Sequence, residues 1–194
     1  MPYYFRFPAV TVRDIVSSMI ILRKHLGIDK IDFLLGSSIG GFQAMEWAVM
    51  EPDSIRQAAF IACSPRVTPW VTAYNESQRM ALEADPSFRA CRSLDGGKAG
   101  LRAARSIALI SYRSYEGYNA TQREASDDTM FADRAGSYQR YQGDKLAARF
   151  DAYSYWYLSR SVDRQNLGRG RGGLDKALGR ISMKPVLIAI HSDR

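Results

Sequence analysis

A short motif rich in glycine and serine is the part of this sequence best suited to chemistry. Residues 36–41 read Gly-Ser-Ser-Ile-Gly-Gly, which contains the pattern Gly-x-Ser-x-Gly centred on Ser38. An apolar run precedes the motif and a helix-like stretch follows it, which is the arrangement of a nucleophile elbow. We therefore expect Ser38 to be a nucleophile in an acyl transfer, with the N–H of Ile39 stabilising an oxyanion. A glycine-rich turn without chemistry is the alternative, because short matches of this kind are common.

A serine nucleophile needs a base, and the base needs an acidic residue that orients it. In enzymes with this elbow, the order along the chain is serine, then Asp or Glu, then histidine. Asp193 follows the late apolar run 185–190 and fits the orienting acid, although a carboxylate that only caps the strand end is the alternative. The two histidines, His25 and His191, do not fit the base in that order. We therefore expect the chain to end before its catalytic histidine.

The first part of the chain alternates helix-like and strand-like patterns. Thr11 and Asp14 have the spacing of a capping box at the start of a helix that Gly27 ends. The expected elements are this helix, a strand at 31–35, a helix at 42–50 and a strand at 58–62. Gly36 and Gly40 are expected to leave room for the serine turn. This order predicts a parallel sheet with helices on its faces.

The pattern then changes to helices. From residue 66 to about 178 the sequence shows no convincing strand. Helices are expected at 75–84, 99–115 and 137–162, the last one broken near Gly143, with a polar loop at 116–134. We therefore predict an α/β-hydrolase-like α/β fold, in which residues 1–66 and 180–194 form a partial core and residues 67–179 an inserted helical lid. Two separate domains are disfavoured, because the single late strand could not stand alone.

Composition limits the classes of protein. The 194 residues fit one domain, or one domain with a large insertion, and no apolar run approaches the ~20 residues that cross a bilayer. No signal peptide is evident, and only two cysteines occur, Cys63 and Cys91. We therefore expect a cytoplasmic protein without membrane contact and without a disulfide framework.

The basic balance of the chain, a net charge of +7, raises the question of an anionic partner. Residues 168–173 read Gly-Arg-Gly-Arg-Gly-Gly, similar to a fragment of an RNA-binding tract. Such tracts usually repeat within disordered sequence, whereas this one is single and lies between helical patterns. A loop is the favoured interpretation, and we expect no nucleic-acid partner.

Several segments together resemble the homoserine O-acetyltransferase family. The similar segments are FPAVTVRD at 7–14, GSSIGGFQAMEW at 36–47, ARSIALISYR at 104–113, YQGDKLAARFDAYSY at 141–155 and Ser-Asp at 192–193. The resemblance covers nearly the whole chain, in order, and the set is far more specific than any one motif.

The resemblance implies an α/β-hydrolase fold with a helical lid, through which such enzymes usually form homodimers. It implies ping-pong transfer of an acetyl group from acetyl-CoA to the hydroxyl of L-homoserine in methionine biosynthesis, without a bound cofactor or metal. Ser38 matches the nucleophile, Ile39 the oxyanion donor and Asp193 the triad acid. Arg105 and Tyr112 match substrate-pocket residues, with the arginine holding the homoserine carboxylate. From the sequence alone, Arg105 reads as a solvated arginine and Tyr112 as core of the lid.

The chain also departs from the family pattern. Ser37, Ile39 and Tyr153 replace the usual glycine, methionine and asparagine. The upstream segment with the second oxyanion donor and the downstream histidine are missing, so we expect an internal fragment with little or no activity. The alternatives are transfer to serine or from succinyl-CoA, a serine esterase or hydrolase of the same fold, and a scaffold or RNA-binding protein that uses Arg169 and Arg171.

Overall fold

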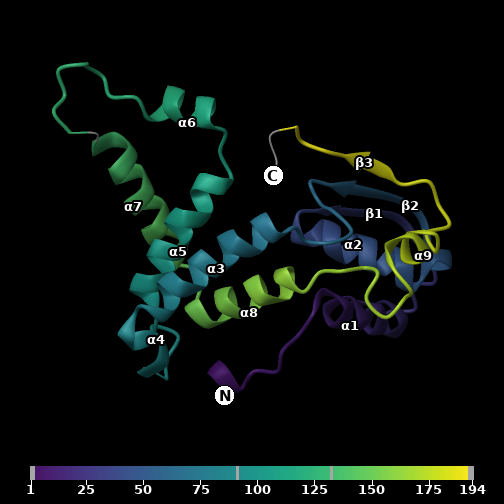
Figure 1. Ribbon diagram of the computed structural model, residues 1–194. Helices are drawn as coiled ribbons and strands as arrows, with labels where there is room; N and C mark the ends of the chain where they lie inside the picture. Colours follow the sequence, from purple (N-terminus) through teal and green to yellow (C-terminus); the bar gives the residue numbers. More distant parts are fainter. Residues whose placement is uncertain (1–2, 91, 132, 192–194) are drawn as a thin grey trace. The chain divides into compact units, whose positions relative to one another are not determined.

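The computed structural model describes residues 3–90, 92–131 and 133–191. The chain divides into two compact units (Figure 1). The sheet unit consists of Pro8–Pro69 and the residues from Arg160 on, and the helical unit consists of Trp70–Ser159 and the residues up to Phe7. No helix in the described part of the chain is both long and apolar enough to span a membrane.

The sheet unit holds a three-stranded parallel sheet of order β1-β2-β3. Its elements are α1 (Val12–His25), β1 (Ile31–Ser37), α2 (Ile39–Met50), the 3-10 turn η2 (Pro52–Ser54), β2 (Ile55–Ile61), α9 (Leu174–Leu178) and β3 (Val186–Ile188). The predicted α/β fold with a parallel sheet and an inserted run of helices is confirmed. The first two strands are longer than predicted, and the third is shorter than the apolar run at 185–190.

The capping box predicted at the start of α1 is present. The Thr11 hydroxyl accepts a hydrogen bond from the Asp14 N–H, and the Asp14 carboxylate accepts one from the Thr11 N–H at 2.7 Å. The Thr11 hydroxyl also donates to the Asp14 carboxylate at 2.7 Å, and the bonds from this hydroxyl and from the Thr11 N–H favour the charged carboxylate and hold the pKa of Asp14 below its usual value. Gly27 follows the helix with φ +68°, a left-handed conformation suited to glycine.

The core of the sheet unit forms where α2 covers one face of the sheet. Ala44, Met45, Ala48 and Val49 of α2 pack with Ala58 and Phe60 of β2, and all of these side chains are buried. A second cluster joins α1 to α2 through Val12, Val16, Ile20 and Phe42. The first cluster holds α2, and with it the turn that precedes α2, against the sheet, and the second cluster packs α1 on α2.

The helical unit is built around an aromatic and aliphatic core. Its elements are η1 (Tyr4–Arg6), α3 (Pro69–Glu83), α4 (Pro86–Ala90), α5 (Lys98–Ser111), α6 (Tyr115–Gln122), α7 (Asp133–Ala147) and α8 (Ala152–Asp163), and α3 and α8 extend into the sheet unit at their outer ends. Leu82, Phe88, Leu101, Ala104 and Tyr153 are buried in its core. Tyr153 also donates a hydrogen bond to the Phe88 carbonyl at 2.9 Å.

Two local predictions in this unit are wrong. The predicted loop at 116–134 contains α6, a helix without a buried residue, which therefore shows no apolar periodicity. The Ser114 hydroxyl caps it by accepting from the Gly117 N–H. The break predicted near Gly143 lies instead at residues 148–151, between α7 and α8, because α7 continues through this glycine and packs closely on α5. A Cβ atom on Gly143 would lie 2.8 Å from the Arg102 carbonyl oxygen.

The division into units differs from the domain ranges expected from the sequence. Residues 160–179, assigned to the lid, belong to the sheet unit, because Leu167 and Ala177 are buried in its core. Residues 3–7, assigned to the core, belong to the helical unit, because the Tyr4 ring packs on Tyr153 with centroids 5.0 Å apart. Hydrophobic contacts between distant segments therefore set these boundaries, rather than the order of elements along the chain.

Candidate active site

Ser38 occupies a strained turn between β1 and α2. Its backbone has φ 54° and ψ −125°, a conformation that costs free energy in a residue with a side chain. Two hydrogen bonds hold the turn: the Ser38 N–H donates to the Ile61 carbonyl at 3.0 Å, and the Ser38 carbonyl accepts from the Phe42 N–H at 3.1 Å. The sheet and the helix thus impose the conformation of a nucleophile elbow.

The reactive groups at this turn are free to meet a substrate. Ser38 is exposed, and its hydroxyl has no hydrogen-bond partner among the residues that the structure describes. Ile39 begins α2, and its N–H likewise has no acceptor in the described part of the chain. The first N–H groups of a helix carry partial positive charge. At such a turn the hydroxyl oxygen can attack a carbonyl carbon, and the N–H can stabilise the oxyanion that forms.

The glycines of the motif have unequal roles. A Cβ atom on Gly36 would lie 2.1 Å from the Gly40 carbonyl oxygen, and one on Gly41 would lie 2.4 Å from the Cys63 Sγ atom. A Cβ atom on Gly40 would meet nothing within 4 Å. The prediction that Gly36 leaves room for the turn is therefore confirmed, and the same prediction for Gly40 is wrong. Gly41, which sequence reasoning missed, is the second glycine that close packing requires.

Replacing Gly36 by alanine tests this packing. We expect the variant to lose about 2–3 kcal/mol of unfolding free energy, because the new methyl group would overlap backbone that cannot move away. Gly40→Ala is the matched control and should change stability by less than about 1 kcal/mol, in the stabilising direction, because it replaces glycine within a helix. Urea unfolding followed by circular dichroism measures both. Equal losses in the two variants would contradict the assignment.

The half-buried side chain of Cys63 lies beside the elbow. This burial raises the pKa of the Cys63 thiol. A raised pKa keeps the sulfur protonated, whereas the thiolate is the reactive form. The contact with Gly41 indicates that Cys63 packs the start of α2 against the segment after β2.

The described residues do not supply a base to Ser38. Asp193, the expected triad acid, lies outside the described residues. His25 and His191 are exposed, and within residues 3–90, 92–131 and 133–191 neither makes a hydrogen bond. The structure therefore presents Ser38 and Ile39 at the elbow without the proton acceptor that a serine nucleophile needs.

Arg105 and Tyr112 lie together in the helical unit. Arg105 is on α5 and Tyr112 is the residue that ends this helix, and the guanidinium carbon lies 5.4 Å from the centre of the tyrosine ring. Tyr112 is 64% exposed, so the interpretation of this residue as lid core is wrong. Arg105 is half-buried and has no ion-pair partner among the described residues. A half-buried guanidinium without a carboxylate partner can accept an anionic ligand.

A tyrosine and a glutamine that sequence reasoning missed adjoin this pair. The Tyr155 hydroxyl donates to the Gln78 Oε1 atom, and the Gln78 amide donates to the Tyr74 carbonyl at 3.0 Å. Burial raises the pKa of Tyr155, the nearby Tyr112 adds to this rise, and Arg105 opposes it. Tyr155 therefore stays protonated and can donate its hydrogen bond at any pH near neutrality. Tyr155 is the last residue of the family-like segment 141–155, and this match was the sequence signal that could have identified it.

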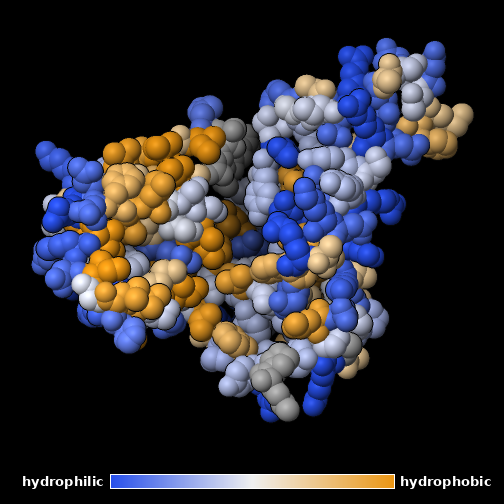
Figure 2. Space-filling model, turned by 180° about the vertical axis from the view of Figure 1, so that it is seen from behind, coloured by the Kyte–Doolittle hydropathy of each residue, from blue (hydrophilic) through white to orange (hydrophobic). Residues whose placement is uncertain are grey.

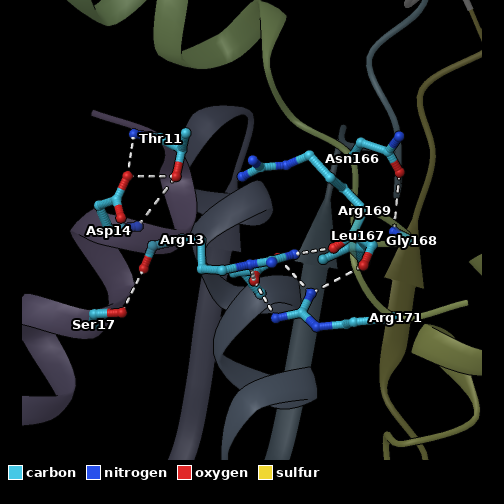
Figure 3. Close-up of polar contacts among 10 residues, drawn as sticks. Thr11, Arg13, Asp14, Ser17, Asn166, Leu167, Gly168, Arg169 and Arg171 are labelled. Atoms are coloured by element: carbon cyan, nitrogen blue, oxygen red, sulfur yellow. Dashed lines mark hydrogen bonds and ion pairs between the residues drawn. The ribbon is translucent and has the colours of Figure 1, made fainter. Parts of the chain in front are cut away.

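The arginine- and glycine-rich segment is a structural loop. Figure 3 shows that Arg13, Arg169 and Arg171 come together. Arg171 forms an ion pair with Glu46, and the Arg13 Nε atom pairs with the same carboxylate at 2.6 Å. The Arg13 guanidinium also donates to the Arg169 carbonyl at 3.0 Å. Because the Arg171 side chain is only 8% exposed, it is not available to bind RNA.

Comparison with known proteins places this geometry in context. A family model described as alpha/beta hydrolase fold matches residues 2–190. A homoserine O-acetyltransferase from Cyclobacterium marinum is 41% identical over 99% of this chain and 54% of its own length. The crystal structure of a homoserine O-acetyltransferase from Bacillus anthracis superposes with a TM-score of 0.89 at 20% identity, over 98% of this chain and 53% of that one, which supports the fold. The acetyl esterase MekB superposes with a TM-score of 0.80 at 30% identity, over 97% of this chain and 55% of its own.

The relatives extend well beyond the region that they share with this chain. The chain spans about half the length of the curated relatives it matches. The similar solved structures show the same proportion.

Proposed function

This chain belongs to the alpha/beta hydrolase fold family, and we propose that it carries the nucleophile of an acyltransferase that moves an acetyl group from acetyl-CoA to the hydroxyl of L-homoserine. The observation that carries the proposal is the exposed Ser38 hydroxyl on a turn with φ 54°. The 41% identity to a homoserine O-acetyltransferase supports the choice of substrates. A place in methionine biosynthesis is part of the same proposal.

In the first half-reaction, the Ser38 oxygen attacks the carbonyl carbon of the acetyl thioester. The Ile39 N–H then donates a hydrogen bond to the oxyanion of the tetrahedral intermediate. The carbon–sulfur bond breaks, and CoA leaves as a thiol that takes up the proton from Ser38. The acetyl group remains on Ser38 as an ester, so the strained turn serves as the carrier between the two substrates.

In the second half-reaction, the hydroxyl of L-homoserine attacks the acetyl carbonyl. The ester bond to Ser38 breaks, and the proton of the attacking hydroxyl returns to the Ser38 oxygen. We propose that Arg105 binds the homoserine carboxylate, because its guanidinium is half-buried and has no ion-pair partner within the described residues. Tyr112 lies against this guanidinium and limits its orientations.

We propose that the base for both steps is a histidine that is not among these 194 residues, is supplied by the rest of the fold and is oriented by Asp193. The support for this step is chemical, because an unassisted serine hydroxyl is a weak nucleophile at neutral pH. No cofactor is required, since every bond that forms or breaks belongs to the substrates or to Ser38.

A chimera with a relative provides the test of this function. In the chimera, this chain replaces the matched region of the Cyclobacterium marinum enzyme, so that the relative supplies the rest of the fold. Hydrolysis of acetyl esters is the second candidate function, favoured by the structural similarity to the acetyl esterase MekB. The assay compares O-acetylhomoserine with free acetate, at saturating L-homoserine and acetyl-CoA. We expect O-acetylhomoserine to dominate, and dominant acetate would favour the hydrolase. Serine as acceptor and succinyl-CoA as donor are tested in the same assay.

Replacing Arg105 by alanine in the chimera should affect the two half-reactions unequally. We expect the second half-reaction to lose about 10²-fold in kcat/KM for L-homoserine, because a charged hydrogen-bonded pair with the carboxylate is lost. Acetylation of Ser38 by acetyl-CoA should change less than about threefold. Arg102→Ala is the matched control on α5, since its ion pair with Asp144 is exposed and should contribute little. Equal losses in both half-reactions would contradict the carboxylate role.

We also propose that the complete protein forms a homodimer through the helical unit. Large apolar side chains on α5, α6 and α7 and in the connection between them support this proposal. Those more than half exposed are Ile110, Tyr112, Tyr115, Met130, Phe131 and Tyr141. Light scattering of the chimera measures its mass in solution, and a monomer at micromolar concentration would contradict the proposal.

A further inference from the structure

A series of hydrogen bonds between α3 and α8 fixes the direction of the Tyr155 phenol proton. The Tyr74 carbonyl can only accept a hydrogen bond, so the amide nitrogen of Gln78 faces it, at 3.0 Å. The Oε1 atom of Gln78 therefore faces Tyr155, and the Tyr155 hydroxyl donates its proton to this atom. Gln78 is only 5% exposed, so water does not compete for these bonds. The Tyr155 oxygen can therefore act toward any further group only as an acceptor.

This acceptor oxygen lies near Arg105. Tyr155 packs against the buried cluster that contains Leu101 and Ala104 of α5, and Ala104 directly precedes Arg105. Burial raises the pKa of Tyr155 and Arg105 opposes this rise, so the charge of the guanidinium reaches the hydroxyl. Within the part of the chain that the structure describes, the Tyr155 oxygen accepts no hydrogen bond and the Arg105 guanidinium donates none. Unused N–H donors and an unused acceptor oxygen therefore lie close together.

The carboxylates of the neighbouring helices already have partners. Glu76 of α3 forms an ion pair with Arg79 at 2.6 Å, and Glu83 accepts a hydrogen bond from the Trp156 indole at 3.3 Å. The helix α5 contains no acidic residue. Hydrophilic residues cover much of the helical unit in Figure 2, and water can satisfy such exposed groups, whereas Tyr155 is half-buried. The Tyr155 oxygen is therefore an acceptor that a bound ligand can use.

We propose that the Tyr155 oxygen accepts a hydrogen bond from the ammonium group of the bound amino acid, while Arg105 holds the carboxylate. This role rests on the proposed function, and it makes Tyr155 a residue that selects α-amino acids over acids without an amino group. A zwitterionic amino acid supplies both the anion that Arg105 can bind and the donor that Tyr155 can accept. Both groups are bonded to the same carbon atom, so neighbouring sites can recognise them together. Gln78 is a positioning residue, because it turns the phenol proton away from the ligand.

Titration calorimetry of the chimera without acetyl-CoA tests this role independently of acyl transfer. The ligands are L-homoserine and γ-hydroxybutyrate, which has the same hydroxyl and carboxylate groups but no amino group. We expect the wild-type chimera to bind L-homoserine more tightly. Tyr155→Phe should weaken L-homoserine binding about tenfold or more, because a hydrogen bond to a charged group is lost, and should change γ-hydroxybutyrate binding less than about threefold. Tyr141→Phe, at an exposed tyrosine of α7, is the matched control and should leave both affinities unchanged.

Two results would overturn the proposal. One is a wild-type chimera that does not prefer L-homoserine, and the other is a Tyr155→Phe variant that weakens both ligands equally or neither. Because Tyr155→Phe leaves the Gln78 Oε1 atom without a donor, circular dichroism checks that the helical content is kept. Tyr155→Phe combined with Gln78→Met, which removes both partners, replaces any single variant that does not fold. Dominant free acetate in the transfer assay would reject acetyl transfer to L-homoserine, whereas unchanged binding in Tyr155→Phe would reject only the role of Tyr155.

Discussion

Replacing Ser38 by alanine in the chimera will lower the rate of O-acetylhomoserine formation by about 10⁴-fold or more. The reason is that alanine has no hydroxyl oxygen, so the acetyl-enzyme ester that links the two half-reactions cannot form. Binding of both substrates should persist, because the turn and the Ile39 N–H do not depend on the hydroxyl. Steady-state rates, with intact mass after exposure to acetyl-CoA, measure the effect.

Ser37 provides the matched control, because it is also exposed and ends β1 one residue earlier. Ser37→Ala should keep the rate within about threefold, since its side chain lies on the strand rather than at the strained turn. An acetyl adduct that persists on the Ser38→Ala variant, or an equal loss of rate in both variants, would refute the assignment of the nucleophile.

Replacing Arg171 by alanine should have the largest effect on stability. Glu46 is 1% exposed, and its carboxylate pairs with Arg13 and Arg171. Without Arg171, the buried Glu46 carboxylate keeps only one of its two arginine partners. Removing one partner of a buried ion pair typically costs about 3–5 kcal/mol of unfolding free energy. Urea unfolding of the 194-residue chain measures the change, and many such chains would be largely unfolded after a loss of this size.

Arg169→Ala separates this ion pair from a general effect of charge in the loop. The Arg169 side chain is exposed, and the Arg13 guanidinium bonds to its backbone carbonyl, which the substitution retains. We therefore expect a change within about 0.5 kcal/mol. A loss equal to that of Arg171→Ala would indicate that the ion pair with Glu46 contributes little.

Local patterns explain how much of the fold could be predicted. The capping box of Thr11 and Asp14 needs only residues three apart, and the parallel sheet follows from the alternation of apolar runs and helical patterns. The helix α6 was not predicted because none of its residues is buried. A helix without a buried face has no periodic spacing of apolar residues in its sequence.

Contacts between distant segments could not be predicted. The requirement for glycine at position 41 comes from Cys63, and the burial of Arg171 comes from Glu46, which is 125 positions away in the sequence. The exposure of Tyr112 depends likewise on how α5 ends rather than on its apolar face. At the candidate site, the strain at Ser38 was predictable because the glycines and the strand-to-helix order are local.

The most direct measurement of the central claim locates the acetyl group during turnover. The wild-type chimera is mixed with acetyl-CoA without acceptor, quenched, digested and examined by mass spectrometry. We expect one acetyl group on the peptide that contains Ser38, and its loss with formation of O-acetylhomoserine when L-homoserine is added. An acetyl group on another residue, or product formation without any acetylated enzyme, would contradict a serine-carried transfer.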